Sequence, residues 1–410
     1  MKTSRPVLAA LLAAATVAAA PVAKPQAPAR ALGPVLATTV LPRAYAPALV
    51  GELPDGRVLV SLHDSIGGGG RLMLFDAALA SATTIIPNRP VPRGPTGLYL
   101  GRGGDSTLII DAASDSLLLV TPMGSVCCGR QLPSAEVTSM GDLGGARVFG
   151  LAGGIVYHEE PGAMPHGMHR GTPVNEQART ALGGGVVVFG APSPLVRLDA
   201  RSLRIDTLAW IHTELSYRQI GPTGRETVLT NPFPLVDTWA VLSDGSLAVV
   251  RGDDSHIDWV RPDGTHDSTH AIGEPRDRLT LEAKTRIADS ALGNPLWHTT
   301  FTPRDPATGQ PGARPEMPPI LIIPAALLAD YRPYFGASAA LADMDDNLWI
   351  QLAGPARSDS GKVYTIVNRR GEVVDRVVVP AREAIVGFGR GAVYLTRGDS
   401  TGQHLDRVRI

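Results

Sequence analysis

The sequence predicts an all-β protein: a six-bladed β-propeller whose blades have four strands each. The first observation is a unit of about 45 residues that recurs along the chain as strand, tight turn, strand, polar hinge, strand, turn and strand. The second is the agreement between 250–261 and 396–409, which share an Arg-Gly-Asp hinge followed by His, Ile or Leu, Asp, any residue, Val and Arg. A β-sandwich would not repeat the same hinge and turn six times.

Each unit alternates apolar runs with turn residues. Asp-Gly and other Gly-containing pairs mark the turns, because a positive φ costs glycine little. The second strand at 247–250 is a continuous apolar run, as expected of a strand covered on both faces, whereas the outer run at 373–379 is broken by charge. The predicted strands are, unit by unit, 48–52, 58–62, 72–75 and 81–86; 97–100, 107–110, 117–120 and 126–132; 147–157, 186–189, 195–198 and 203–208; 235–242, 247–250, 257–260 and 266–272; 339–342, 348–352, 362–367 and 373–379; 385–388, 393–396 and 405–410.

The sixth unit has only three strands of its own. An unpaired edge would remain beside 405–410, and proteins normally avoid such edges. The run 35–41 is apolar and β-branched and has no unit of its own. We therefore predict that this N-terminal strand closes the ring and that 35–410 forms a single propeller domain.

Two segments interrupt the period. The first, 157–182, is predicted to lie between the first two strands of the third unit, and the second, 273–332, between the fourth and fifth units. Within the second, 277–292 has helical spacing and 303–319 is a Pro/Gly-rich loop. The residues predicted to share one helix face are Leu279, Ala283, Ile287 and Ala291.

The N-terminal residues have the composition of an export signal. Lys2 and Arg5 precede the apolar stretch 7–20, which is too short to span a bilayer. Residues 1–20 are thus predicted to be a signal peptide and 21–34 a disordered Ala/Pro-rich leader. We expect a periplasmic or secreted protein without a membrane span. A lipoprotein anchor is not expected, because no cysteine lies near the cleavage region.

The balance of charge bears on the partners. The chain has 38 Lys and Arg residues against 39 Asp and Glu residues, a net charge of −1 at pH 7. This balance argues against a dedicated nucleic-acid or anionic-membrane partner. The expected partner is an unidentified protein or small molecule, and the expected state is a monomer.

The run 341–350, Leu-Ala-Asp-Met-Asp-Asp-Asn-Leu-Trp-Ile, resembles the D-x-x-G-N-[LI]-W-[VI] blade signature of the NHL-repeat-like six-bladed β-propeller superfamily. Asp346 stands where that group usually has Gly. The resemblance implies the fold and little chemistry, because such propellers include lactonases, dehydrogenases and binding platforms. Asp343, Asp345 and Asp346 fail the spacing of a calcium-binding EF-hand loop, and we interpret them as a hairpin turn.

Candidate ligand-binding residues occupy the hinges between second and third strands. These hinges and the connections between blades share one face of a propeller, and function tends to lie on loops that a rigid scaffold presents. The alternative interpretation is ordinary turn polarity. The candidates are His63, Asp64, Asp111, Asp115, Arg251, Asp253, Asp254, His256, Arg397 and Asp399.

A second group of candidates lies in the first insertion. His158, His166 and His169, with Met164 and Met168 nearby, suggest soft-metal ligands. Their spacing matches no recognised ligand set, and a polar surface loop explains them as well. We therefore predict no metal site and no cofactor.

The predicted function is that of an exported, non-catalytic binding or scaffold protein, because no catalytic motif stands out. The alternative is a calcium-dependent hydrolase of the lactonase type, since the resemblance implies relatives that hold calcium at the channel mouth. A quinone-cofactor dehydrogenase is a more distant third.

The only two cysteines are neighbours, Cys127 and Cys128, on the predicted outer strand of the second unit. Successive side chains of a strand point to opposite faces, so we expect one sulfur to pack in the blade and the other to face away. Neighbouring Cα atoms also lie closer than in most disulfides. Two free thiols are the predicted state.

Overall fold

The structure, a computed structural model, confirms the predicted all-β class. It describes residues 28–41, 45–64, 70–89, 98–103, 106–111, 116–131, 149–151, 154–158, 186–189, 192–199, 202, 204–220, 226–269, 272, 276, 278–292, 321–336, 339–353 and 361–410.

The strands form four-stranded units in which each strand pairs antiparallel with the next along the unit. The first two units are β3 (Tyr45–Glu52), β4 (Val58–Asp64), β5 (Gly70–Phe75) and β6 (Ala82–Arg89), then β7 (Leu98–Gly103), β8 (Ser106–Asp111), β9 (Ser116–Val120) and β10 (Val126–Gln131). The next two are β11 (Phe149–Leu151), β12 (Gly154–His158), β14 (Ser193–Asp199) and β15 (Ile205–Ile211), then β18 (Thr238–Val241), β19 (Leu247–Val250), β20 (Ile257–Val260) and β21 (His266–Ser268). The last two are β23 (Ala340–Ala342), β24 (Leu348–Gln351), β25 (Lys362–Val367) and β26 (Val373–Val379), then β27 (Glu383–Gly389), β28 (Ala392–Gly398) and β29 (Gln403–Arg409) with β2 (Val35–Leu41).

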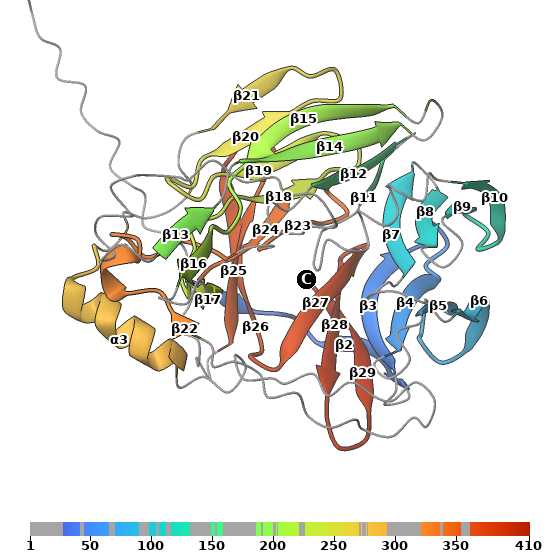
Figure 1. The fold of residues 1–410 in the computed structure, drawn as a ribbon. Helices are drawn as coiled ribbons and strands as arrows, with labels where there is room; N and C mark the ends of the chain where they lie inside the picture. The colour runs from blue at the N-terminus through green and yellow to red at the C-terminus, as the bar shows by residue number, and fades with distance from the viewer. Residues whose placement is uncertain are drawn as a thin grey trace, which may run out of the picture.

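These units are arranged around a common centre, with the first strands β27, β3, β7, β11, β18 and β23 on the inside (Figure 1). The first strands of the sixth and first units pair directly, parallel to each other. Antiparallel four-stranded sheets packed radially in this way are the blades of a β-propeller. The number of blades stays a prediction, because much of the chain between 132 and 192 lies outside the described residues.

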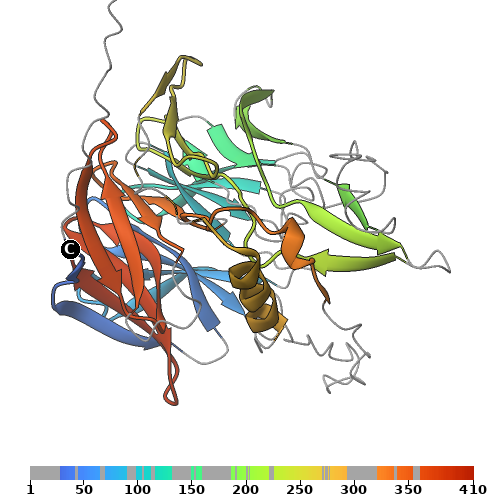
Figure 2. The ribbon, with the colours of Figure 1, turned by 90° about the vertical axis from the view of Figure 1, so that its left-hand side faces the viewer.

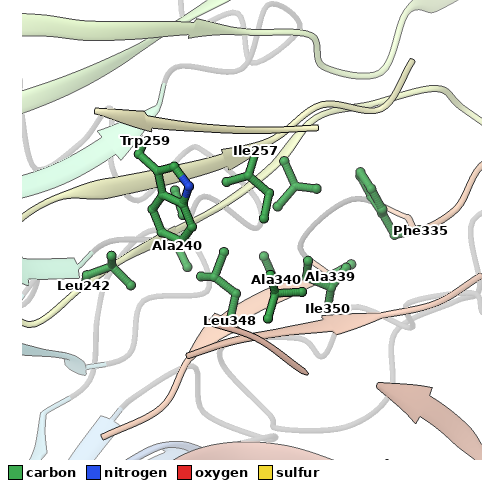
Figure 3. Close-up of a cluster of buried hydrophobic side chains, with 12 residues drawn as sticks. Ala240, Leu242, Ile257, Trp259, Phe335, Ala339, Ala340, Leu348 and Ile350 are labelled. Atoms are coloured by element: carbon green, nitrogen blue, oxygen red, sulfur yellow. The ribbon is translucent and has the colours of Figure 1, made fainter. Parts of the chain in front are cut away.

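The hydrophobic core is divided among the interfaces between neighbouring sheets. The clearest cluster lies between the fourth and fifth units, where Ile257 and Trp259 of β20 face Leu348 and Ile350 of β24 (Figure 3). Similar clusters join the first and second, third and fourth, fifth and sixth, and sixth and first units. The sheets of the first, fourth, fifth and sixth units therefore bury both faces, which explains continuous apolar second strands such as β19.

The predicted closure by the N-terminal strand is confirmed. β2 pairs antiparallel with β29 along its length, from Val35 opposite Val408 to Leu41 opposite Gln403. The leader prediction needs a correction at its end. Residues 30–31, predicted to be disordered, form strand β1 (Arg30–Ala31) parallel to β26, held by an ion pair between Arg30 and Asp375 at 2.6 Å.

The third unit differs from its prediction. The run 147–157 was expected to be one strand, and 186–189 the next. Instead β11 and β12 form a hairpin, and β12 pairs directly with β14. The first insertion therefore lies between the second and third strands, not between the first two. The apolar run β13 (Val186–Phe189) belongs to another sheet.

That other sheet, the accessory sheet, contains β13, β16 (Ser216–Ile220), β17 (Glu226–Thr230) and β22 (Leu321–Ile322) in this order. Strands β16 and β17 were not predicted. The accessory sheet draws its strands from the hinge of the third unit and from the connections that precede and follow the fourth unit. Connections alternate between the two ends of antiparallel strands, so these three segments leave the propeller on the same face, the hinge face. Figure 2 shows β16 and β17 extending away from the sixth unit.

The predicted helix is present as α3 (Leu281–Leu292), beginning four residues later than expected. Its Ile287 and Ala288 pack against Tyr217 and Leu229 of the accessory sheet, next to the short helix η2 (Ala325–Leu327). The Lys284 ammonium is buried and donates to the Leu328 carbonyl at 2.8 Å and to Asp330 Oδ1 at 2.7 Å. The predicted Pro/Gly loop at 303–319 lies outside the described residues.

The cysteines lie on the outer strand β10, as predicted, and both are free thiols. The prediction that their sulfurs face opposite sides is wrong. The pairing of β10 with β9 is irregular between Cys127 and Arg130, and the Cys128 Sγ lies 2.9 Å from the Cys127 Sγ. A bulge removes the strict alternation on which the prediction depended.

Candidate functional site

The most extensive polar cluster described at a predicted hinge lies between β19 and β20. At its centre, Arg251 follows the last residue of β19 and donates from Nε to Asp258 Oδ2 at 2.7 Å. Its Nη1 donates to Asp237 Oδ2 at 2.7 Å and to the Trp210 carbonyl at 2.8 Å. Arg251 thus links its own hinge to β20, to the segment before β18 and to β15 of the neighbouring unit.

Asp237 joins the third and fourth units. Only 2% of its side chain is exposed, and its carboxylate also accepts from the backbone N–H of Gly252 and of His212, both at 2.9 Å. A Cβ at Gly252 would lie 2.3 Å from the Val236 carbonyl oxygen. The Gly of this Arg-Gly-Asp hinge is therefore required by the close approach of two backbone segments.

His256 lies between two carboxylates. Its Nδ1 contacts Asp254 and its Nε2 lies 3.2 Å from Asp258 Oδ1. Burial disfavours the imidazolium, but the hydrogen bond to Asp254 and the charges of Asp258 and Asp254 outweigh it and raise the pKa of His256. The cluster is most stable with the imidazole protonated.

The atoms of Asp253, Asp254 and His256 that could serve as metal ligands lie within 4.8 Å of one another. Both His256 nitrogens already contact carboxylates, and a metal would require the deprotonated imidazole. This group is better explained as an ion-pair cluster of the hinge.

A pocket of about 330 Å³ adjoins this cluster, between β15 of the third unit and β20 with β21 of the fourth. Trp210, with 57% of its surface exposed, lies on one wall, and Arg251 and Asp258 lie on the hinge side. The full lining is Thr207, Leu208, Ala209, Trp210, Arg251, Asp258, Val260 and His266. The pocket combines an aromatic surface, aliphatic groups and the hydrogen-bonded ion pair of Arg251 and Asp258.

The sixth unit repeats the hinge cluster. Arg397 Nε donates to Asp406 Oδ2 at 3.0 Å, and its Nη1 donates to Asp399 Oδ2 at 3.2 Å. His404 Nε2 lies 2.8 Å from Asp399 Oδ2. Arg397, His404 and Asp406 correspond to Arg251, His256 and Asp258, so the shared sequence pattern produces a shared cross-link between second and third strands.

The remaining candidates are placed less completely. His63 and Asp64 end β4, and His158 ends β12, where only the backbone is described. Asp111 ends β8, 3% exposed. Asp115, His166 and His169 lie outside the described residues. The structure thus brings together the candidates of the fourth unit in one cluster and those of the sixth unit in another.

Several site residues were missing from the sequence prediction. Asp258 could have been found, because His-x-Asp occurs in both of the most similar repeats. Asp237 and Trp210 carry no comparable signal, since they approach Arg251 only through the packing of neighbouring units. His266 borders the pocket from the start of β21.

The three aspartates of the fifth unit form the predicted hairpin turn. The Asp343 carboxylate accepts from the backbone N–H of Asp345 and Asn347 and from Trp349 Nε1, all at 2.9 Å. This carboxylate is occupied by donors within the turn. Asp346 adopts a positive φ of 61°, as the Gly usual at this position of the signature would allow.

The Asp346 side chain has a further structural role that Gly could not fill. Its carboxylate accepts from Ser243 of the fourth unit through the backbone N–H at 2.7 Å and through the hydroxyl at 2.6 Å. It also pairs with Arg369 at 2.7 Å, and Arg369 pairs with Asp244 at 2.6 Å. These contacts join the turns of two neighbouring units on the face opposite the hinges.

Among the helices of the described residues, none is long and apolar enough to cross a membrane. No protein-family model matches the chain, and no curated protein sequence matches it.

The solved structures to which the chain is similar include β-propeller proteins. Virginiamycin B lyase from Staphylococcus aureus shares 10% identity at a TM-score of 0.36, over 91% of this chain and 99% of that one. A DUF4221 family member from Bacteroides vulgatus shares 9% identity at a TM-score of 0.41, over 93% of this chain and 95% of that one. The propeller domain of the Trilobed protease from Pyrococcus furiosus shares 8% identity at a TM-score of 0.37, over 89% of this chain and 80% of that one. Similarity at this level says nothing of activity. The fold assignment rests on the topology of the chain itself.

Proposed function

We propose that the chain is an exported, non-catalytic binding protein whose ligand occupies the pocket between β15 and β20. The observation that carries the proposal is the exposure of Trp210 at this pocket. An exposed indole ring next to polar groups offers both a flat apolar surface and hydrogen-bonding partners.

The dimensions and chemistry of the pocket favour a small polar ring, such as a sugar. A volume of about 330 Å³ is near the lower end for ligand pockets. The face of a sugar ring is apolar enough to stack on Trp210, and its hydroxyls can reach His266 and the Arg251–Asp258 pair. Ligand or protein binding was the function predicted from the sequence, and this pocket is the site that we propose for it.

The engagement of the charged groups supports binding rather than catalysis. Arg251 is shared among Asp237, Asp258 and the Trp210 carbonyl. Asp258 accepts from Arg251, Ser268 and His256, and these hydrogen bonds and charges outweigh burial and lower its pKa. A carboxylate held in this way is a poor general base, because its proton affinity is reduced.

The test is a titration of tryptophan fluorescence and melting temperature with D-glucose, cellobiose and D-glucono-1,5-lactone. Trp239, Trp259 and Trp349 are buried, and Trp297 lies outside the described residues. The fluorescence titration therefore uses a Trp297→Phe background, in which a change on binding reports on Trp210. A ligand at 100 times its Kd should stabilise the wild type by about 2.7 kcal/mol. Trp210→Ala should abolish the stabilisation, while Val374→Ala, an exposed position on β26, should retain it.

The same samples test the calcium-dependent lactonase alternative. Hydrolysis of D-glucono-1,5-lactone is followed by proton release, with and without calcium. Turnover that requires calcium and survives Trp210→Ala would replace the binding proposal with the hydrolase. Export is checked separately, by N-terminal sequencing of the mature chain, with cleavage expected near Ala20 or Ala29.

A further inference from the structure

The two cysteines form a compact, accessible pair. β10 is the terminal strand of its sheet, with β9 as its neighbour. Cys128 is exposed and Cys127 is half-buried, so both thiols can be reached by a small molecule in solution.

A β-bulge brings the two sulfurs to the same side. Cys127 pairs with Leu119, and regular pairing resumes with Arg130 opposite Leu117. Cys128 and Gly129 together therefore face a single residue, which is the definition of a bulge. Cys128 adopts a positive φ of 55°, and its Sγ lies 2.9 Å from the Cys127 Sγ.

We propose that Cys127 and Cys128 are a redox modification site, in which a small organic disulfide converts the pair into an intramolecular disulfide between adjacent residues. The Cys128 thiolate attacks one sulfur of the disulfide RSSR, forming a mixed disulfide and releasing one thiol RSH. The Cys127 thiolate then attacks the Cys128 sulfur and releases the second RSH. The protein loses two protons and two electrons, and the small disulfide gains them.

The order of the two attacks follows from exposure, and the Cys127 pKa supports it. The hydrogen bond with Cys128, with burial and the neighbouring charge, raises the pKa of Cys127, so the exposed Cys128 reacts first. The product is a strained ring, because adjacent Cα atoms are only about 3.8 Å apart. Strained, exposed disulfides are readily reduced, so the modification is reversible.

The test uses the full chain, first reduced, then incubated with oxidised glutathione, then alkylated under denaturing conditions and weighed intact. The expected product has lost two hydrogens, carries no glutathione and takes up no alkylating reagent, and dithiothreitol restores both thiols. Cys127→Ser and Cys128→Ser should each stop at a single glutathione adduct.

A control pair tests whether the disulfide requires the bulge or only two cysteines that are adjacent in the sequence. Ala82 and Thr83 are exposed neighbours on the outer strand β6, where they pair in unbroken register with Phe75 and Leu74. In a Cys127→Ser/Cys128→Ser background, Ala82→Cys/Thr83→Cys should end as glutathione adducts, because regular strand geometry separates the sulfurs. The proposal is overturned if the native pair also ends as adducts or stays reduced.

Discussion

At the scale of single residues, charge pairs hold neighbouring strands and neighbouring units together at the hinge face. Asp237 is the residue on which several of these contacts converge: it accepts from Arg251 and from two backbone N–H groups, of Gly252 and His212. The exposed Asp253, two residues beyond Arg251, accepts from the backbone N–H of Asp254. The two aspartates therefore differ in burial and in the number of partners that depend on them.

Asp237→Asn should destabilise the protein by about 3 kcal/mol, because it leaves the half-buried Arg251 without its buried partner. The matched substitution Asp253→Asn should change stability by no more than about 0.5 kcal/mol. Urea unfolding of both variants measures the difference. Equal effects of the two substitutions would show that the Asp237 contacts do not stabilise the hinge.

The raised pKa of His256 predicts a pH-dependent contribution. A group with a folded-state pKa above its unfolded value stabilises fully below the unfolded pKa, about 6.5, and loses this effect as pH rises through the folded pKa. The melting-temperature difference between wild type and His256→Gln should thus be greatest below pH 6.5 and shrink toward pH 9. A difference that is constant or grows with pH contradicts the ion-pair arrangement.

The sequence predicted part of this residue-level picture. Arg251, Asp253, Asp254 and His256 were identified because the hinge repeats, and repetition is visible in the sequence. Asp237 and Trp210 were not, because their contacts with Arg251 depend on the packing of one unit against the next. Such contacts leave no periodic pattern.

At the scale of elements, β27 and β3 make a very close approach where the sixth unit meets the first. Gly387 lies opposite Val50 and Phe388 opposite Gly51. A Cβ at Gly387 would lie 2.1 Å from the Val50 carbonyl oxygen, whereas one at Gly51 would meet nothing within 4 Å. Gly387 therefore leaves no room for a side chain, whereas Gly51 does.

Gly387→Ala should lower the melting temperature by several degrees, since two inner strands must separate to admit the methyl group. Gly51→Ala should leave it unchanged or raise it slightly. Differential scanning calorimetry of both variants gives the comparison. If Gly387→Ala is as stable as Gly51→Ala, the parallel contact between these strands is not formed as described.

Elements were predictable where pairing is local. Hairpins with Gly-containing turns were found in most units, and α3 was found from its spacing. The third unit was assigned wrongly because 186–189 has the same apolar composition as an inner strand. Composition alone does not show which strand such a run pairs with. β17 and β22 pair across a long stretch of sequence, so their sheet could not be derived from local patterns.

At the scale of the whole molecule, the two ends of the described chain meet in one unit. β2 supplies the outer strand beside β29, and Thr38 donates to Asp406, which also pairs with Arg397 of the hinge cluster. Ring closure and the hinge of the sixth unit thus share a residue. The closure was predicted from the sequence because the sixth unit lacked a fourth strand and the N-terminal strand belonged to no unit of its own.

Deletion of 33–42 should lower the melting temperature sharply, because it exposes the edge of β29 and removes Leu41 from the core between the sixth and first units. Arg30→Ala, which removes only the exposed ion pair with Asp375, should have a small effect. An unchanged melting temperature after the deletion would contradict closure by β2.

The proposed function requires a ligand between the third and fourth units, beside Trp210. The most direct measurement is a crystallographic screen of the protein with small ring fragments that carry hydroxyl groups. Bound fragments should gather against Trp210, with their hydroxyls toward His266, Arg251 and Asp258. Fragments that bind only at the common centre of the units, or on the face opposite the hinges, would contradict the proposed site.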